Sequence, residues 1–506
     1  MDPLINCMLF FLFTCTAIQT LVWLLSKSSS KGKYKLPPGP SPLPIIGNLL
    51  NMGPKPHKSL AKLAKIHGPI MSLKLGQLTT IVISSSDMAK EVLLTHDHSL
   101  SNRTIPDACY ALNHKDYGLT FMNISPRWRA LRKICNGQLF SHMALDASQD
   151  LRLKKMQELL NEIHNSSLKC EAIDIGSLAF KTAVNLLTNT IFSMDLFHST
   201  DIAGEFHELI KNIMIWTGKP NLADFFPVLR TVDPQGVRGR GGFYAGKVID
   251  IVRDLIDQRL KMREGTGFDK MKFNDMLHTL LNISQENSLE IMDQLQIQHL
   301  VLTLFVAGTD TISSTIEWAM AELLRNPEVM LKAKQELKQT IGVGNPVKET
   351  DIERLPYLKA IIKETFRLHP PVPFLIPRKA ITSVEICGYT IPKDAQVLVN
   401  VWEIGRDSSI WDNPNLYLPE RFFGSEIDLK GQDFELTPFG GGRRICPGLP
   451  LAMRTLLLML GSLINSFDWK LEGDMKVEDI NMDDKFGIAL EKAQPLRVVP
   501  LIINNN

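Results

Sequence analysis

The segment from Pro438 to Gly448 constrains this chain more than any other, because it places a cysteine at the start of a helix. It reads Pro438-Phe-Gly-Gly-Gly-Arg-Arg-Ile-Cys446-Pro-Gly448. Three consecutive glycines allow positive φ angles and let a backbone approach a flat ligand closely. After Pro447, which suits the first turn of a helix, the apolar run from Leu449 to Phe467 predicts a helix with Cys446 at its N-terminus. The macrodipole and the free N–H groups of such a helix favour a thiolate.

Cys446 is one of seven cysteines, whose odd number and wide scatter argue against a disulfide framework. A lone cysteine is most often a buried, inert side chain. The spacing Phe439-x-x-Gly442-x-Arg444-x-Cys446-x-Gly448, however, matches the haem-binding loop of the cytochrome P-450 superfamily, which this chain resembles. The resemblance implies haem b, with its iron held by the Cys446 thiolate, a propionate bound by Arg444, and Phe439 packed beside the sulfur.

Further motifs agree with this resemblance. Glu364-Thr-Phe-Arg367 places an acid and a base on one helix face, and Arg421 follows in Pro419-Glu-Arg421-Phe422. Such pairs usually lie on solvated faces, but the resemblance implies a Glu–Arg–Arg network of Glu364, Arg367 and Arg421. A buried network of this kind mainly fixes geometry, because desolvation offsets much of its attraction.

Trp128 and Arg132 lie four residues apart on a predicted helix, so they share a face. Taken alone, they would be a core tryptophan beside a surface arginine. The resemblance implies that both side chains reach the haem propionates, as does Arg378.

A long apolar helix is predicted from about Asp293 to Asn326, with Ala307-Gly-Thr-Asp310-Thr311 at its middle. Glycine and threonine are poor residues for a helix interior, and a bulge there often marks a functional site. The alternative is a tolerated helix defect with Asp310 exposed. Asp310 and Thr311 resemble the family's acid–alcohol pair, which implies proton delivery to bound oxygen. Residue 312 departs from many plant members because it is isoleucine instead of threonine.

The N-terminus predicts a membrane anchor. No charged residue occurs from Pro3 to Leu25, and as a helix this stretch would span roughly 34 Å. Lys27, Lys31, Lys33 and Lys35 follow, so the positive-inside rule leaves the remaining chain in the cytosol. A cleaved signal peptide would have a basic start and a shorter apolar stretch.

We therefore expect three parts: a transmembrane anchor at residues 3–25, a basic and proline-rich hinge at 26–44, and one domain at 45–506. The chain would span the endoplasmic reticulum membrane once, contact membrane lipid, and place its catalytic domain in the cytosol. The net charge of +2 lacks the strongly basic character that is typical of nucleic-acid-binding proteins.

The expected fold is mainly α with small β-sheets, the cytochrome P-450 fold. Helical periodicity predicts helices at 59–67, 87–95, 127–140, 150–166, 245–262, 322–341 and 357–368. Strand patterns predict a hairpin at 71–84 and further strands near 384–391, 397–401 and 496–501. Residue 403 is glutamate where relatives usually carry a small side chain, so we expect the packing around this residue to differ from theirs.

Residues 218–227, 233–236, 371–378 and 483–488 resemble plant terpenoid hydroxylases that include geraniol 8-hydroxylase. This resemblance implies a monooxygenase that hydroxylates a small apolar substrate with O2, most simply a geraniol-type monoterpenoid. Electrons would come from an NADPH-dependent cytochrome reductase. An apolar pocket would be lined by Leu304, Ala307, Val372, Phe374 and Ile488, although core packing explains each of them equally well.

Alternative functions stay open at this point. The substrate could be a sesquiterpenoid, a diterpenoid, or a phenolic or flavonoid compound. A non-catalytic haem-binding membrane protein would tolerate Thr311→Ala. A hydroperoxide isomerase would work without NADPH, and such family members typically lack the acid–alcohol pair.

Overall fold

The computed structural model describes residues 35–193, 200–264, 275–285, 292–473 and 475–503, together with Phe13, Thr14, Thr16, Ala17 and Thr20. Apart from these five residues, the predicted anchor and the first part of the hinge lie outside the described residues. Backbone contacts divide the chain into two compact units. The first contains residues 1–104, 221–235 and 374–404, and the second contains 105–220, 236–373 and 405–506.

The first unit is built on a five-stranded sheet with the order β1-β2-β8-β5-β3. β1 (Ile70–Leu75) and β2 (Leu78–Ile83) form the predicted antiparallel hairpin, and β8 (Gln396–Val399) pairs in parallel with β2. The other sheet strands are β5 (Arg378–Lys379) and β3 (Asn102–Arg103), and a separate hairpin joins β6 (Val384–Ile386) to β7 (Tyr389–Ile391). Its helices are α2 (Leu49–Met52), α3 (Pro56–His67), α4 (Ser86–Lys90), η1 (Glu91–Thr95), α11 (Leu222–Phe225), η4 (Pro227–Thr231) and α18 (Val401–Ile404).

The strand predicted at 397–401 is too long. It ends at Val399, and Val401 begins α18 instead, because the side chain of Asn400 accepts the N–H of Glu403 at 3.3 Å. Asparagine is a favoured residue before a helix. Glu403 is partly buried in the first turn of α18, where an acidic side chain suits the helix dipole.

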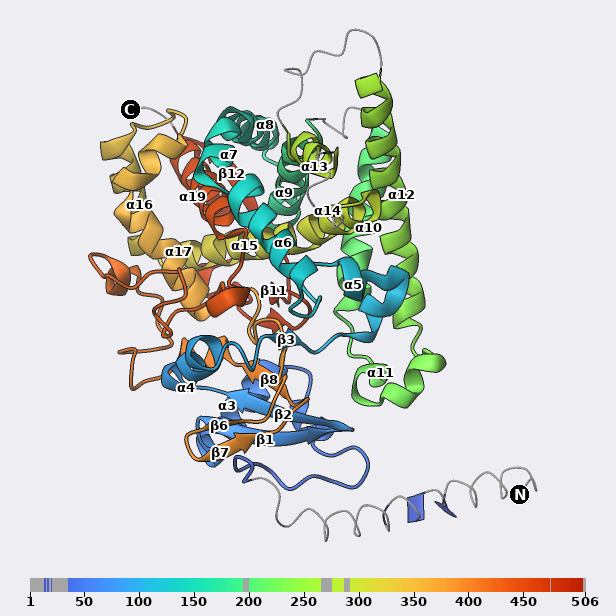
Figure 1. Ribbon diagram of the computed structural model, residues 1–506. Helices are drawn as coiled ribbons and strands as arrows, with labels where there is room; N and C mark the ends of the chain where they lie inside the picture. Colours follow the sequence, from blue (N-terminus) through green and yellow to red (C-terminus); the bar gives the residue numbers. More distant parts are fainter. Residues whose placement is uncertain are drawn as a thin grey trace, which may run out of the picture. The chain divides into compact units, whose positions relative to one another are not determined.

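The second unit is mainly helical, and α14 (Gln294–Gly308) and α15 (Asp310–Arg325) run in line through it (Figure 1). α15 packs against α9 (Ile175–Phe192), α17 (Pro356–Leu368) and α19 (Leu449–Ser466). Gln294–Arg325 and Leu449–Ser466 are the two stretches in the described part of the chain that are long and apolar enough to cross a membrane. Most of each is buried inside the protein, as expected of core helices.

The remaining helices of this unit surround these core helices. They are α5 (His114–Tyr117), α6 (Pro126–Ile134), α7 (His142–Ala147), α8 (Gln149–Leu168), α10 (Thr200–Thr217), α12 (Val237–Glu264), α13 (Met276–Gln285) and α16 (Pro327–Thr340). Shorter turns are η2 (Asp107–Asn113), η3 (Cys135–Leu139), η5 (Glu349–Arg354), η6 (Pro419–Phe422), η7 (Gly442–Arg444) and η8 (Val477–Asp479). β4 (Ile173–Asp174), β12 (Arg497–Ile502) and β9 (Phe467–Leu471) form one sheet, and β10 (Asp484–Lys485) pairs with β11 (Glu491–Lys492).

Two helix predictions need correction. The helix predicted from 293 to 326 is divided at Thr309, at the position where its sequence favours a defect. The helix predicted at 322–341 crosses a real boundary, because α15 ends at Arg325 and Pro327 begins α16. Proline disfavours a helical conformation in the residue before it, here Asn326.

Candidate active site

The segment around Cys446 forms a tight loop that leads into α19. The Cys446 N–H donates to Phe439 O at 2.9 Å and closes the loop. Gly440 and Gly442 have φ angles of 71° and 64°, a region that favours glycine, so the glycines are needed here. The ring of Phe439 packs edge-on against Phe366 of α17, with centroids 5.3 Å apart. The loop therefore fixes Cys446 at the beginning of a helix, as the sequence predicts.

The protonation of Cys446 depends on opposing effects. Burial raises the pKa of the Cys446 thiol, whereas the N–H groups of Gly448 and Leu449 and the positive charge of Arg132 lower it. Arg132 lies on α6 and donates to Ile445 O, next to the cysteine. The helix start favours a thiolate, as predicted, but burial outweighs it. A metal cation bound to the sulfur would remove the proton outright.

Arg444 and Trp128 meet on one side of this loop. The guanidinium of Arg444 lies 4.3 Å from the ring centroid of Trp128 and donates to Met122 O at 2.7 Å. The indole N–H of Trp128 donates to Leu119 O at 3.2 Å. The structure thus brings together the predicted residues of α6 and the cysteine loop, and the ring face of Trp128, not its N–H, is turned to Arg444.

One side of the helix is exposed near the boundary between α14 and α15, although Thr309 at the boundary itself is buried. Thr309, between the helices, and Thr311 each donate a hydroxyl hydrogen to the carbonyl four residues earlier, at 2.9 Å. Ala307 is exposed and Thr311 partly exposed. A Cβ on Gly308 would lie 3.0 Å from Leu187, so this glycine faces the packed side. The break therefore presents a hydroxyl and a small side chain to open space.

Asp310, the other predicted catalytic residue, is nearly buried, with 8% of its surface exposed. Burial raises the pKa of the Asp310 carboxyl to about 7, with a further contribution from Glu491, while Lys485 and Lys211 oppose the shift. At neutral pH the carboxyl is close to half protonated. The isoleucine at position 312 is 4% exposed and belongs to the hydrophobic core, so it leaves the acid–alcohol pair unaffected.

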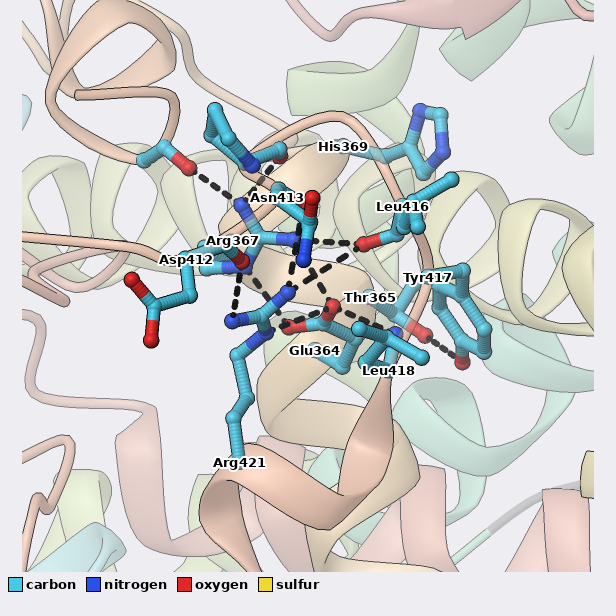
Figure 2. Close-up of polar contacts among 12 residues, drawn as sticks. Glu364, Thr365, Arg367, His369, Asp412, Asn413, Leu416, Tyr417, Leu418 and Arg421 are labelled. Atoms are coloured by element: carbon cyan, nitrogen blue, oxygen red, sulfur yellow. Dashed lines mark hydrogen bonds and ion pairs between the residues drawn. The ribbon is translucent and has the colours of Figure 1, made fainter. Parts of the chain in front are cut away.

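The predicted charged network is present and almost completely buried (Figure 2). Arg367 and Glu364 form a two-pronged pair, with both N–O distances at 2.7 Å and both side chains 0% exposed. Arg421 reaches the same carboxylate at 3.1 Å, and the Leu418 N–H donates to it at 2.7 Å. Every carboxylate oxygen thus has a donor, which is the condition for burying charge at tolerable cost.

The second role of Arg367 is to hold the chain that follows α18. Its guanidinium donates to the backbone carbonyls of Gly405, Pro414 and Leu416. A Cβ on Gly405 would lie 2.3 Å from Arg367 O, so this position requires glycine. The network therefore ties α17 to the chain that follows α18 and to η6.

The predicted pocket residues are divided between the units. In the second unit, Leu304 is buried and Ala307 exposed one turn apart on α14, and Val372 and Ile488 are partly buried. Phe374 and Arg378 belong to the first unit. There Phe374 is buried, and Arg378 pairs with Asp97 at 2.8 Å, with both side chains nearly covered.

Sequence analysis did not single out Ser314 and Trp318 of α15. Both donate to the carbonyl of Leu490 in the segment before β11. Their spacing of three and seven residues from Thr311 was the available signal, because it places all three side chains on one helix face.

A family model for cytochrome P-450 matches residues 37–496. The chain belongs to the cytochrome P-450 family. It is 54% identical to a geraniol 8-hydroxylase of Catharanthus roseus over 490 residues, which cover 97% of both chains. It is 51% identical to a drimenol monooxygenase of Persicaria hydropiper over 95% of both chains. It is 50% identical to a 7-ethoxycoumarin O-deethylase of Helianthus tuberosus, over 96% of this chain and 97% of the relative. As a cytochrome P-450, the chain is an oxidoreductase of the monooxygenase class.

Cytochrome P-450 enzymes hold haem iron through a cysteine thiolate, and the donor set here fits that group. Cys446 receives backbone N–H groups suited to an anionic sulfur. Arg132 and Arg444 flank the same loop and supply the positive charge that propionates require. The exposed Ala307 and the partly exposed Thr311 provide a helix face without bulky side chains.

Proposed function

We propose that this cytochrome P-450 hydroxylates a geraniol-type monoterpenoid, with O2 as oxidant and electrons from an NADPH-dependent reductase. The observation that carries the substrate class is the 54% identity to a geraniol 8-hydroxylase along almost the whole of both chains. The drimenol relative favours a sesquiterpenoid alcohol as the second candidate. The 7-ethoxycoumarin relative keeps a phenolic substrate as a third, and a diterpenoid stays open.

In this proposal Cys446 is the iron ligand, and Arg444 and Arg132 hold the haem propionates. Trp128 supports Arg444 through its ring face, Phe439 shields the sulfur side, and Arg378 is proposed as a further propionate ligand. When bound, the haem supplies oxygen activation, and its thiolate ligand promotes O–O cleavage.

Asp310 and Thr311 are proposed to supply protons during that chemistry. A general acid works best when its pKa lies near the working pH, and burial raises the pKa of Asp310 to about 7. The Thr311 hydroxyl already donates to Ala307 O at 2.9 Å, so its oxygen retains lone pairs that can accept a proton or a water hydrogen bond. Its partial exposure makes the hydroxyl available to a bound molecule.

An apolar substrate suits the side chains proposed to surround it. Leu304, Ala307, Val372, Phe374 and Ile488 carry no charge and no side-chain hydrogen-bonding group. Such a surface recognises a hydrocarbon chain by shape and leaves the substrate hydroxyl to a few polar groups.

The test is to express the full chain in membranes with a plant reductase, and to supply NADPH with geraniol, drimenol and a flavonoid. Geraniol should be hydroxylated only when both reductase and NADPH are present. Cys446→Ser membranes serve as the control and should form no product. Turnover of the flavonoid alone would contradict the proposal.

We further propose that residues 3–25 anchor the chain in the endoplasmic reticulum membrane through a hinge at 26–44, and that residues 45–506 face the cytosol. The Asn-X-Ser/Thr sequons at Asn102, Asn123, Asn165 and Asn282 allow a test. All four should remain unglycosylated in a protein that resists alkaline extraction from microsomes. Glycosylation at any of them would show that residues 45–506 face the lumen, the opposite of the proposed topology.

A further inference from the structure

One backbone carbonyl in the second unit accepts two hydrogen bonds from α15. The Ser314 hydroxyl donates to Leu490 O at 2.8 Å, and the Trp318 indole N–H donates to the same oxygen at 3.1 Å. Ser314 is 3% exposed and Trp318 is fully buried, so both bonds are shielded from water. A carbonyl has two lone pairs, and here side chains of one helix use both.

The N–H of Leu490 binds a third segment. It donates to Pro371 O at 2.7 Å, in the chain that leaves α17. Leu490 therefore joins α15, the segment 370–373 and the β10–β11 hairpin at a single residue. Two proposed pocket residues flank this junction: Val372 follows Pro371, and Ile488 stands two residues before Leu490.

The junction lies on the helix face that carries Thr311. Positions 311, 314 and 318 differ by three and seven residues, a spacing that places side chains on the same side of a helix. Ala489 and Leu490 are buried at 2% and 1%, whereas residues 486–488 at the hairpin tip are partly exposed. The base of the β10–β11 hairpin is therefore docked on the helix face that carries Thr311, and the tip of the hairpin is accessible.

Two further side chains contact the ring of Trp318 and hold it in place. His369 stacks on one side with centroids 4.0 Å apart and planes 7° apart, and Lys492 Nζ lies 4.7 Å from the ring centroid. Nε2 of His369 lies 2.7 Å from Glu322 Oε1, which fixes the imidazole in turn. Lys492 belongs to β11, so the hairpin itself helps to orient the indole that binds it.

We propose that Ser314 and Trp318 are positioning residues that hold the tip 486–488 and Val372 in register with Thr311, and so determine which carbon of the substrate is hydroxylated. This inference rests on the proposed function, because it takes both segments to contact the substrate. Neither side chain needs to touch the substrate for this role. The tip also packs near the end of α10, where a Cβ on Gly218 would lie 3.0 Å from Ile488 N.

The first experiment compares product distributions from geraniol. Trp318→Phe keeps an aromatic side chain and removes the N–H, and Ser314→Ala removes the hydroxyl. Both variants should bind haem with the wild-type carbon monoxide spectrum, but form at least about five times more of the minor regioisomers and show a raised KM. Ser314→Thr restores a hydroxyl and should recover the wild-type product ratio.

Trp469→Phe is the matched control, because the Trp469 indole N–H also donates to a leucine carbonyl, Leu463 O, at 3.2 Å. Trp469 lies on β9, outside the docked segments, so its replacement loses the same kind of bond without moving the hairpin. It should leave the product ratio unchanged. An unchanged product ratio in Trp318→Phe and Ser314→Ala would overturn the inference, as would an equal change in the control.

A second measurement separates this inference from the proposed substrate. Hydrogen exchange of the haem-loaded protein without substrate should accelerate by about ten-fold or more in residues 484–492 of Trp318→Phe, but not of Trp469→Phe. If the wild-type protein oxidises no terpenoid, the proposed function fails, while exchange still decides whether Trp318 docks the hairpin. Equal exchange in the wild type and in Trp318→Phe would refute the docking.

Discussion

Glu364 and Asp310 are both buried carboxylates on helices of the second unit, but their surroundings differ. Glu364 is paired with two arginines and a backbone N–H, so its negative charge is matched on every side. Among the described residues, no salt bridge reaches Asp310, and burial raises the pKa of its carboxyl to about 7. A carboxylate that is paired with cations stabilises a fixed structure. A carboxyl without an ion-pair partner, with its pKa near 7, can take up and release a proton. The two residues therefore separate the scaffold of this enzyme from its proposed chemistry.

The largest effect should follow from breaking the matched site. Glu364→Gln leaves Arg367 and Arg421 without a counter-charge, and removing one partner of a buried pair costs about 3–5 kcal/mol. We expect little haem-containing protein and a large fall in Tm, measured by the carbon monoxide spectrum and thermal unfolding. Glu162→Gln, which breaks an exposed pair with Lys181, should cost less than about 1 kcal/mol. Equal stability of these two variants would contradict a scaffold role for Glu364.

At the exposed helix face near Asp310, Thr311→Ala should reduce substrate hydroxylation and leave folding unchanged. Loss of a proton-delivering group lowers product formation by about 100-fold or more, while NADPH consumption continues. The measurement is product formed per NADPH at wild-type haem content. Thr303→Ala is the control, because the Thr303 hydroxyl likewise donates to a carbonyl four residues earlier, at 2.8 Å. Unchanged coupling in Thr311→Ala would remove Thr311 from the mechanism.

The pH dependence of stability should report Asp310. The pKa of its carboxyl is raised from 3.8 to about 7 in the folded protein, so between these values the folded state holds a proton that the unfolded chain has released. The contribution of Asp310 is therefore present below about pH 4 and lost as the pH rises through 7, at about 1.4 kcal/mol for each unit of pKa difference. Asp310→Asn should flatten this decline in unfolding experiments between pH 4 and 7. A decline of the same slope in the variant would show that another group causes it.

A smaller effect of opposite sign is expected when one of two paired histidines, His299, is replaced. Nδ1 of His114 lies 2.9 Å from Nδ1 of His299, and burial lowers the pKa values to about 3 and about 4. Both rings stay neutral in the folded protein, whereas the unfolded chain takes up protons below about pH 6.5. Stability should therefore fall as the pH drops from 6.5 toward 4, and His299→Gln should weaken that fall. Replacing the exposed His164 by Gln should not change it.

The sequence predicted the elements whose signal is local. Strand β1 alternates between buried and less buried residues from Met71 to Leu75, and the Glu364–Arg367 pair lies within one helix turn. The poor helix formers around Thr309 mark the division between α14 and α15. The cysteine loop was recognisable because close approach and positive φ require glycine at fixed positions. These features depend on neighbours within a few residues.

Long-range features were not predictable in this way. Helix α9 escaped prediction because it is buried on most sides, which leaves only a narrow exposed stripe at Ser177 and Lys181. The junction at Leu490 links positions separated by more than a hundred residues, so no local pattern indicates it. The pairing of Arg378 with Asp97 depends on tertiary contacts in the same manner.

If Cys446 holds haem iron as a thiolate, the carbon monoxide difference spectrum of the reduced protein must depend on this residue. Wild-type protein should show the strongly red-shifted band of thiolate-ligated haem, and Cys446→Ser should lose that band. Cys135→Ser removes a buried cysteine outside residues 438–448 and should keep the band. Folded wild-type protein without the band, or Cys446→Ser protein that retains it, would show that Cys446 is not the thiolate ligand of a haem iron.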